Sequence, residues 1–170
     1  AEYANRKGYS KHSPALPLYT EEDARQALTH FVTTSFGAPV EVAPGMHATF
    51  RPAGHILGSA TISLDITDGR QRTILFSGDL GRPQHPILQP PAPPPAADVI
   101  LVESTYGNRQ HEDAKSLQRF EEAIVRTAAR GGMVIIPSFA VDRTEVILFH
   151  LHQLVEAKRV PNMPVYVDSP

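Results

Sequence analysis

This 170-residue chain has the composition of a globular protein with a hydrophobic core, because 41% of its residues are hydrophobic and 20% are charged. Its net charge of −2 argues against a protein that coats nucleic acid through bulk positive charge, although local phosphodiester binding by a metal ion and a few arginines stays open. The chain has no cysteine, which excludes disulfides and thiolate metal sites, so a transition-metal site would need histidine and carboxylate ligands.

No stretch of the sequence approaches the roughly 18 to 20 apolar residues of a membrane-spanning helix, and no signal-peptide pattern opens it. We therefore expect no membrane association and a cytoplasmic location. The chain begins without a methionine and ends directly after an apolar, strand-like segment at 165–167. Both ends resemble boundaries inside a longer protein, so we expect further segments on each side.

The N-terminal segment is predicted to be irregular over residues 1–20, where a glycine and two prolines interrupt any regular element. Thr20 and the three carboxylates at 21–23 predict a helix with a hydroxyl N-cap. The apolar spacing carries this helix through Phe31, and Gly37 marks its end.

A β-hairpin is predicted from residue 60 onward. Residues 60–67 alternate strictly between apolar and polar, which is typical of a strand with one buried face. Asp68 and Gly69 supply a tight turn, and residues 72–76 return as the partner strand.

The pattern changes after a proline-rich connection at 83–97, which holds seven of the sixteen prolines. Beyond it, short apolar strands alternate with amphipathic helices, which predicts a parallel α/β sheet. The expected strands are 99–102, 133–136 and 165–167, and the expected helices are 117–129 and 144–157.

Two candidate metal ligands flank the hairpin. His55 precedes the outgoing strand and Asp79 follows the returning one, so the hairpin should bring imidazole and carboxylate together. Zinc accepts both ligand types, and Gly54, Gly58 and Gly78 allow sharp turns and close approach beside such a site.

Glu103 is a third candidate, because it follows the next apolar strand at an element end. Each residue also has an ordinary interpretation. His55 suits a structural hydrogen bond, Asp79 suits a turn, and Glu103 suits a helix start or the surface. The chemistry alone leaves both interpretations open.

Four motifs appear in a fixed order. They are Ala-Gly-His-Ile-Leu-Gly-Ser-Ala at 53–60, Phe-Ser-Gly-Asp-Leu-Gly-Arg at 76–82, Glu-Ser-Thr-Tyr-Gly at 103–107 and Ile-Pro-Ser-Phe-Ala-Val-Asp-Arg-Thr at 136–144. In this order the chain resembles the β-CASP family of metallo-β-lactamase-fold nucleases, whose RNA-processing members include the messenger RNA 3′-end endonuclease and bacterial and archaeal relatives. The resemblance covers most of the chain from about residue 50 onward.

The resemblance implies a role for each candidate. His55 matches the histidine that binds one zinc ion, Asp79 the carboxylate that bridges two, and Glu103 the acidic residue that positions a histidine from a later segment. In such enzymes a hydroxide held between two zinc ions attacks phosphorus. The implied function of the complete protein is that of a zinc-dependent ribonuclease or RNA-processing exonuclease acting on single-stranded RNA, with homodimerisation as a further expectation.

The chain also departs from the family pattern, because the His-x-His-x-Asp-His cluster and the later histidines are absent. Its one His-x-His pair, His150 and His152, lies in a predicted helix, where residues two apart do not face each other. One histidine and one aspartate do not complete a zinc site. We therefore expect the isolated chain to be inactive and to bind zinc weakly or not at all.

Three further residues are candidates for substrate binding. Ser138 and Arg143 fall between a predicted strand and a helix start, where a phosphate would find backbone N–H groups and a guanidinium. The alternative is that Asp142 caps the helix and Arg143 is solvated. Tyr106 is suited to stacking on a base or to packing. The remaining histidines are interpreted as ordinary polar residues: His12, His30, His47, His85 and His111.

The fold class predicted is α/β, with part of a metallo-β-lactamase αββα domain at 1–107 followed by the first part of an inserted α/β β-CASP domain at 108–170. The motif at 103–107 resembles RNA-directed members more than DNA-repair members, which favours RNA. Three alternatives stay open: a DNA-directed nuclease of the same family, a non-catalytic scaffold in an RNA-processing complex and a small-molecule hydrolase.

Overall fold

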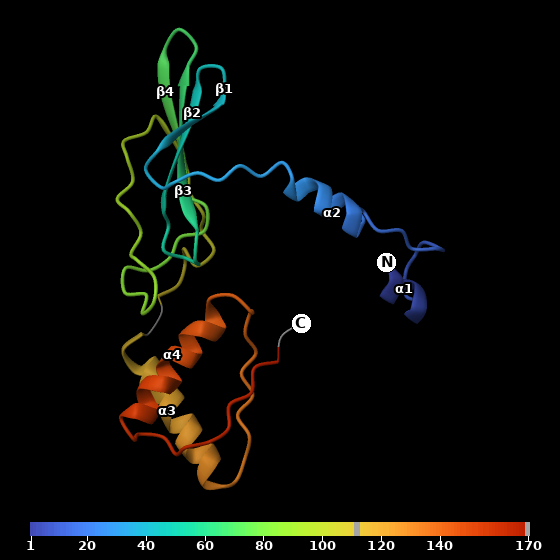
Figure 1. The fold of residues 1–170 in the computed structure, drawn as a ribbon. Coiled ribbons are helices and arrows are strands. Elements are labelled where there is room, and N and C mark those ends of the chain that lie inside the picture. The colour runs from blue at the N-terminus through green and yellow to red at the C-terminus, as the bar shows by residue number, and fades with distance from the viewer. Residues whose placement is uncertain (111–112, 169–170) are drawn as a thin grey trace. The chain divides into compact units, whose positions relative to one another are not determined.

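The protein was analysed as a computed structural model, which describes residues 1–110 and 113–168. The predicted surface histidine His111 lies outside the described residues. The chain divides into two compact units, Ala1–Ser35 and Phe36–Pro170. The fold class is the mixed α/β class that the sequence predicts. A five-stranded sheet is preceded in the sequence by two helices and followed by two more (Figure 1).

The first unit begins with a short helix that the sequence analysis did not predict. Helix α1 spans Glu2–Lys7, so the prediction of an irregular segment over residues 1–20 was wrong at its start. Residues 2–7 contain no glycine or proline, so nothing in them prevents a helix. The helix ends at Gly8, whose N–H donates to the carbonyl of Ala4. The guanidinium of Arg6 lies 5.5 Å from the ring centroid of Tyr3 and adds a cation–π contact.

Helix α2 spans Glu21–Leu28 and begins as predicted. The Asp23 N–H donates to Thr20 Oγ1 at 3.2 Å, and the Thr20 N–H donates to Asp23 Oδ2 at 2.8 Å, which forms a capping box. The helix ends before Phe31, earlier than predicted. None of its residues is buried, so no packing against a core extends it beyond its own hydrogen bonds.

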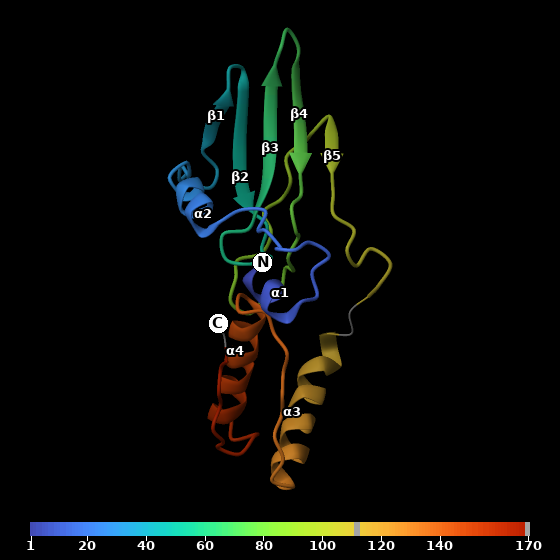
Figure 2. The ribbon, with the colours of Figure 1, turned by 90° about the vertical axis from the view of Figure 1, so that its right-hand side faces the viewer.

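The second unit contains a sheet whose strands follow the chain order. Figure 2 shows its face, and the strands are β1 (Pro39–Ala43), β2 (Met46–Pro52), β3 (Ala60–Thr67), β4 (Gln71–Phe76) and β5 (Val99–Leu101). Strands β1 to β4 pair with one another in antiparallel order, and β5 pairs with β4 in parallel. The predicted hairpin is therefore confirmed, with Ile62 opposite Phe76 near its open end.

The buried face of the sheet differs from the expectation. Thr49, Ser63 and Leu75 are cross-strand partners on one face and are 6%, 3% and 4% exposed, whereas Ile62 and Leu64 on the other face are only half-buried. The proline-rich connection at 83–97 contains no helix or strand, as predicted, but it turns and bends over 83–88 and is not extended there. It crosses one face of the sheet in both ribbon views (Figures 1 and 2).

The C-terminal part contains the two predicted helices, α3 (Asp113–Ala129) and α4 (Arg143–Glu156). They pack around a small core in which Ile124, Leu154 and Val160 are 2%, 8% and 6% exposed. Their amphipathic spacing predicted both helices because the pattern is local to each segment.

The predicted strands 133–136 and 165–167 do not form, so the parallel sheet expected in this part is absent from the described residues. Ile135 and Tyr166 are 79% and 86% exposed. A strand requires a hydrogen-bonded partner, and neither segment has one within residues 1–110 and 113–168. The domain boundary at residue 107 stays a prediction. Within the same ranges, no helix has both the length and the apolar character needed to cross a membrane.

Candidate functional site

The sheet brings His55 and Asp79 together at one end. His55 lies in the connection between β2 and β3, and Asp79 lies just beyond β4, which pairs with β3. The His55 Nε2 atom is 3.8 Å from Asp79 Oδ2, with 43% and 76% of the two side chains exposed. The two groups therefore meet at an accessible position rather than inside the core.

A serine hydroxyl holds the His55 connection in shape. Ser59 Oγ accepts the backbone N–H of His55 at 3.0 Å and that of Ile56 at 3.2 Å. The Ala53 N–H donates to the Ser59 carbonyl at 3.0 Å, which closes the connection between the two strands. Ser59 was not predicted as a supporting residue, because its role depends on a loop conformation that sequence spacing does not reveal.

Two glycines allow the Asp79 turn to approach its neighbours. Gly78 has φ +55, and a Cβ there would lie 3.0 Å from the Ala60 carbonyl oxygen. At Gly81 a Cβ would lie 1.6 Å from the carbonyl oxygen of Gly54, so only glycine fits. The Gly81 N–H donates to the Ala53 carbonyl at 2.9 Å and joins the two loops directly.

Glu103 supports the same turn through its carboxylate. Its Oε1 accepts the Leu80 N–H at 3.1 Å, and its Oε2 accepts the Thr105 N–H at 3.0 Å. These bonds lower the pKa of Glu103, with the hydrogen bonds from Thr105 contributing most, the Leu80 N–H less and the charge of His55 least. The structure thus brings His55, Asp79 and Glu103 into one neighbourhood.

The His55 and Asp79 pair fits two ligand positions of a zinc ion. Two atoms that each lie about 2.1 Å from one ion at a tetrahedral angle are about 3.4 Å apart. The observed separation of 3.8 Å is close to that value and needs only a small adjustment. Among the described residues, no group of three histidine or carboxylate side chains is arranged to hold a metal ion, so the pair does not form a full coordination shell.

His85 was interpreted as an ordinary surface or polar residue, and it is a polar, hydrogen-bonded residue that is largely buried rather than at the surface. Its Nδ1 accepts the N–H groups of Ile87 and Leu88 at 3.2 and 3.0 Å, so Nε2 carries the proton and donates to Asp142 Oδ1 at 2.9 Å. The side chains of His85 and Asp142 are 12% and 22% exposed. Sequence spacing gave no signal, because the partner lies on a distant segment.

Asp142 has an unusual backbone at the start of α4. Its φ and ψ are 72° and −67°, and the Arg143 N–H donates to the Val141 carbonyl at 3.0 Å, which makes a strained γ-turn. Its side chain makes no capping hydrogen bond. Asp142 therefore occupies the N-cap position and Arg143 is exposed, as the alternative interpretation expected, but the Asp142 carboxylate binds His85 instead of the helix N-terminus.

The three candidate substrate-binding residues are all exposed. Ser138 is exposed, and its hydroxyl is 3.5 Å from the carbonyl oxygen of Ile136. Arg143 is the first residue of α4 and is exposed, and Tyr106 is 57% exposed. Their roles in substrate binding stay predictions.

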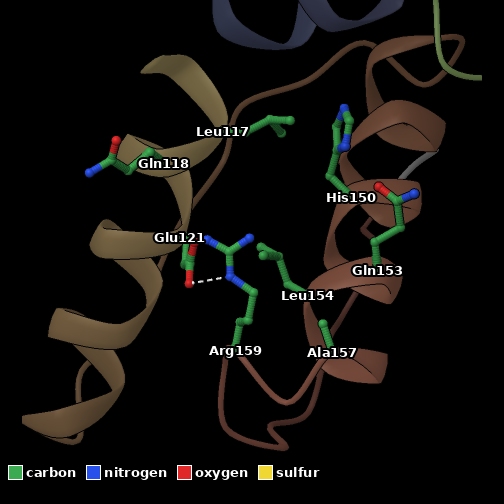
Figure 3. A pocket seen from close by; sticks show the side chains of 8 residues that line it. All are labelled: Leu117, Gln118, Glu121, His150, Gln153, Leu154, Ala157 and Arg159. Carbon is green, nitrogen blue, oxygen red and sulfur yellow. Dashed lines mark hydrogen bonds and ion pairs between the residues drawn. The ribbon is translucent and has the colours of Figure 1, made fainter. Parts of the chain in front are cut away.

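His150 and His152 both lie in α4, as predicted. His150 lines a cavity of about 400 Å³ between α3 and α4, shown in Figure 3. Glu121 and Arg159 form an ion pair at this cavity, with Arg159 Nε 2.8 Å from Glu121 Oε1. The imidazole of His150 therefore belongs to the helix pair and not to a His-x-His metal site.

Comparison with known proteins shows clear relatives, although no protein-family model matches the chain. Ribonuclease TTHA0252 of Thermus thermophilus is 37% identical over 155 residues, covering 91% of the chain and 35% of that protein. Transcription termination factor FttA of Methanothermobacter thermautotrophicus is 33% identical over 157 residues, covering 89% of the chain and 24% of that protein. The RNase J-like protein of Methanocaldococcus jannaschii is 33% identical over 155 residues, covering 89% of the chain and 36% of that protein.

The chain thus spans between 24 and 36% of the length of these relatives. The similarity extends over nearly the whole chain and includes the segments that carry the four motifs. From these relatives and from the motifs in their order, the chain belongs to the β-CASP family of metallo-β-lactamase-fold nucleases.

Proposed function

We propose that the complete protein is a zinc-dependent ribonuclease that hydrolyses phosphodiester bonds of single-stranded RNA during RNA processing. The observation that carries the proposal is the 3.8 Å separation of His55 Nε2 and Asp79 Oδ2 at an exposed end of the sheet. Two of the relatives support it, because their names describe a ribonuclease and an RNase J-like protein.

The chain's own residues would act as follows. His55 offers a neutral imidazole nitrogen and Asp79 a carboxylate oxygen to the same ion. Glu103 stays ionised, because hydrogen bonding lowers its pKa, and it holds the Leu80 N–H beside Asp79. Zinc, when bound, supplies water activation and neutralises charge on the phosphate oxygens.

The remaining parts of the proposal concern substrate, assembly and location. Ser138, Arg143 and Tyr106 would contact the phosphate and a base of the RNA. We assign exonuclease action, a homodimer and the cytoplasm to the complete protein. The isolated chain would be inactive, because His55 and Asp79 supply two of the three or four protein ligands that zinc requires.

The test compares matched RNA and DNA. The complete protein is incubated with a labelled single-stranded RNA and with the DNA of the same sequence, with zinc and after chelation. The proposal expects zinc-dependent cleavage of the RNA that is faster than that of the DNA, with mononucleotides as early products. Faster cleavage of DNA would identify a DNA-directed nuclease, and no cleavage of either with zinc would identify a scaffold.

A further inference from the structure

Hydrogen bonds of Ser77, two residues before Asp79, join the end of β4 to the end of β5. The Ser77 N–H donates to the Leu101 carbonyl at 2.9 Å and extends the parallel pairing of the two strands. The Ser77 hydroxyl accepts the Glu103 N–H at 3.0 Å and donates to the Gly78 carbonyl at 2.7 Å. Ser77 is 6% exposed, so water does not readily replace these bonds.

The carboxylate of Glu103 then returns to the same turn. Its Oε1 accepts the Leu80 N–H at 3.1 Å. Ser77 and Glu103 together therefore hold both neighbours of Asp79, Gly78 through its carbonyl and Leu80 through its N–H. The Asp79 side chain itself is 76% exposed, so its direction is set by this backbone and not by packing.

We propose that Ser77 is a positioning residue whose hydroxyl, acting through Glu103, fixes the turn at 78–80 and thereby directs the Asp79 carboxylate toward His55. The inference deepens the proposed function and rests on it for the role of Asp79. A hydroxyl is suited to this position because it donates and accepts at once. Such support of a site residue by fixed neighbours maintains its geometry before substrate binds.

The turn that follows Ser77 is closely packed. A Cβ on Gly78 would already lie 3.0 Å from the Ala60 carbonyl oxygen, so the turn packs closely against the first residue of β3. Ser77 lies directly after β4, and its hydroxyl bonds both the Gly78 carbonyl and the Glu103 N–H.

Ser63 provides a matched control within the same sheet. It is 3% exposed, and its hydroxyl accepts a hydrogen bond from Arg51 Nη1 at 2.8 Å. Ser63 lies in β3 opposite Leu75, and its hydroxyl makes no bond to the turn at 78–80. Its replacement removes a hydrogen bond from an equally buried serine without touching the proposed connection.

The test measures hydrogen exchange at the Leu80 amide in the complete protein. Ser77→Ala is expected to accelerate this exchange by about tenfold, the order expected for the loss of one net hydrogen bond, although Ser77 does not bind that amide itself. Ser63→Ala is expected to leave it within about twofold. Because Ser77→Ala also changes side-chain size, the variants Ser77→Thr and Ser77→Val form a second comparison that differs by the hydroxyl alone, and only Ser77→Thr should retain slow exchange.

Unchanged Leu80 exchange in Ser77→Ala, equal acceleration in Ser63→Ala, or equal exchange in Ser77→Thr and Ser77→Val would each overturn the inference. The exchange readout does not depend on catalysis. A wild-type protein that fails to cleave RNA with zinc would therefore refute the proposed function, while the coupling of Ser77 to Leu80 would still be measured.

Discussion

The backbone of Gly81 lies directly against the carbonyl group of Gly54, the residue that precedes His55. A Cβ built on Gly81 would fall 1.6 Å from the Gly54 oxygen and 2.5 Å from the His55 nitrogen. The two loops that carry His55 and Asp79 are thus in contact backbone to backbone, and the contact is possible because Gly81 has no side chain.

This contact predicts a strong effect of one added methyl group. Gly81→Ala should force the two loops apart, separate His55 from Asp79 and reduce zinc affinity by about tenfold or more. Gly107→Ala is the control, because its Cβ would meet no atom closer than 3.4 Å. Titration calorimetry of the complete protein measures both. Wild-type affinity in Gly81→Ala would show that the close approach does not set the site.

The hydrogen bonds of Glu103 predict a titration at low pH. Its pKa lies below the ordinary value of 4.5, chiefly because Thr105 hydrogen bonds to the ionised carboxylate. The ionised Glu103 carboxylate therefore stabilises the folded state at pH values above the unfolded-state pKa of Glu103. This stabilisation is lost as the pH falls through the lower folded-state pKa of the same group. The amide proton shifts of Leu80 and Thr105 should titrate together with a midpoint below 4.5.

The control for this titration is Glu103→Gln, which has no carboxylate to protonate. Its Leu80 and Thr105 amide shifts should stay flat over the same pH range. A midpoint above 4.5 in the wild type, or an unchanged titration in Glu103→Gln, would contradict the assignment.

The bond between His85 and Asp142 predicts a loss of stability. His85→Ala leaves the largely buried Asp142 carboxylate and the N–H groups of Ile87 and Leu88 without their partner, which should cost about 1 to 3 kcal/mol. Urea unfolding measures the change. The exposed His47 supplies the comparison, since His47→Ala should change the free energy of unfolding by less than about 0.5 kcal/mol. Equal effects of the two variants would show that the bond contributes nothing.

The proposed ligand role of Asp79 predicts a large loss of turnover. Asp79→Asn keeps the shape of the side chain and removes its charge, so RNA cleavage by the complete protein should fall by about a hundredfold or more with the fold intact. The control is Asp65→Asn, because Asp65 lies in the same hairpin and its Oδ1 accepts the Thr73 hydroxyl at 2.6 Å, away from the turn at 78–80. Near-normal cleavage by Asp79→Asn would count against its role.

Features set by local sequence were predicted correctly. The N-cap at Thr20, the hairpin from β3 to β4 and the two C-terminal helices each depend on residues close in the chain. The juxtaposition of His55 and Asp79 also followed from the hairpin, because pairing of two strands determines where their outer ends lie.

Features set by distant partners were missed. The segments at 133–136 and 165–167 have strand-like sequences, but a strand needs a partner that composition does not reveal. The same reason applies to His85, whose partner Asp142 lies on another segment, and to Gly81, whose close contact depends on the path of a second loop. The more buried face of β3 carries Thr61 and Ser63, which the apolar and polar alternation alone did not indicate.

The most direct test of the account is the position of zinc in crystals of the complete protein, located by anomalous diffraction at the zinc absorption edge. The account predicts one zinc ion within about 2.0 to 2.2 Å of both His55 Nε2 and an Asp79 carboxylate oxygen. A zinc ion bound elsewhere, with His55 and Asp79 both outside its coordination shell, would contradict it.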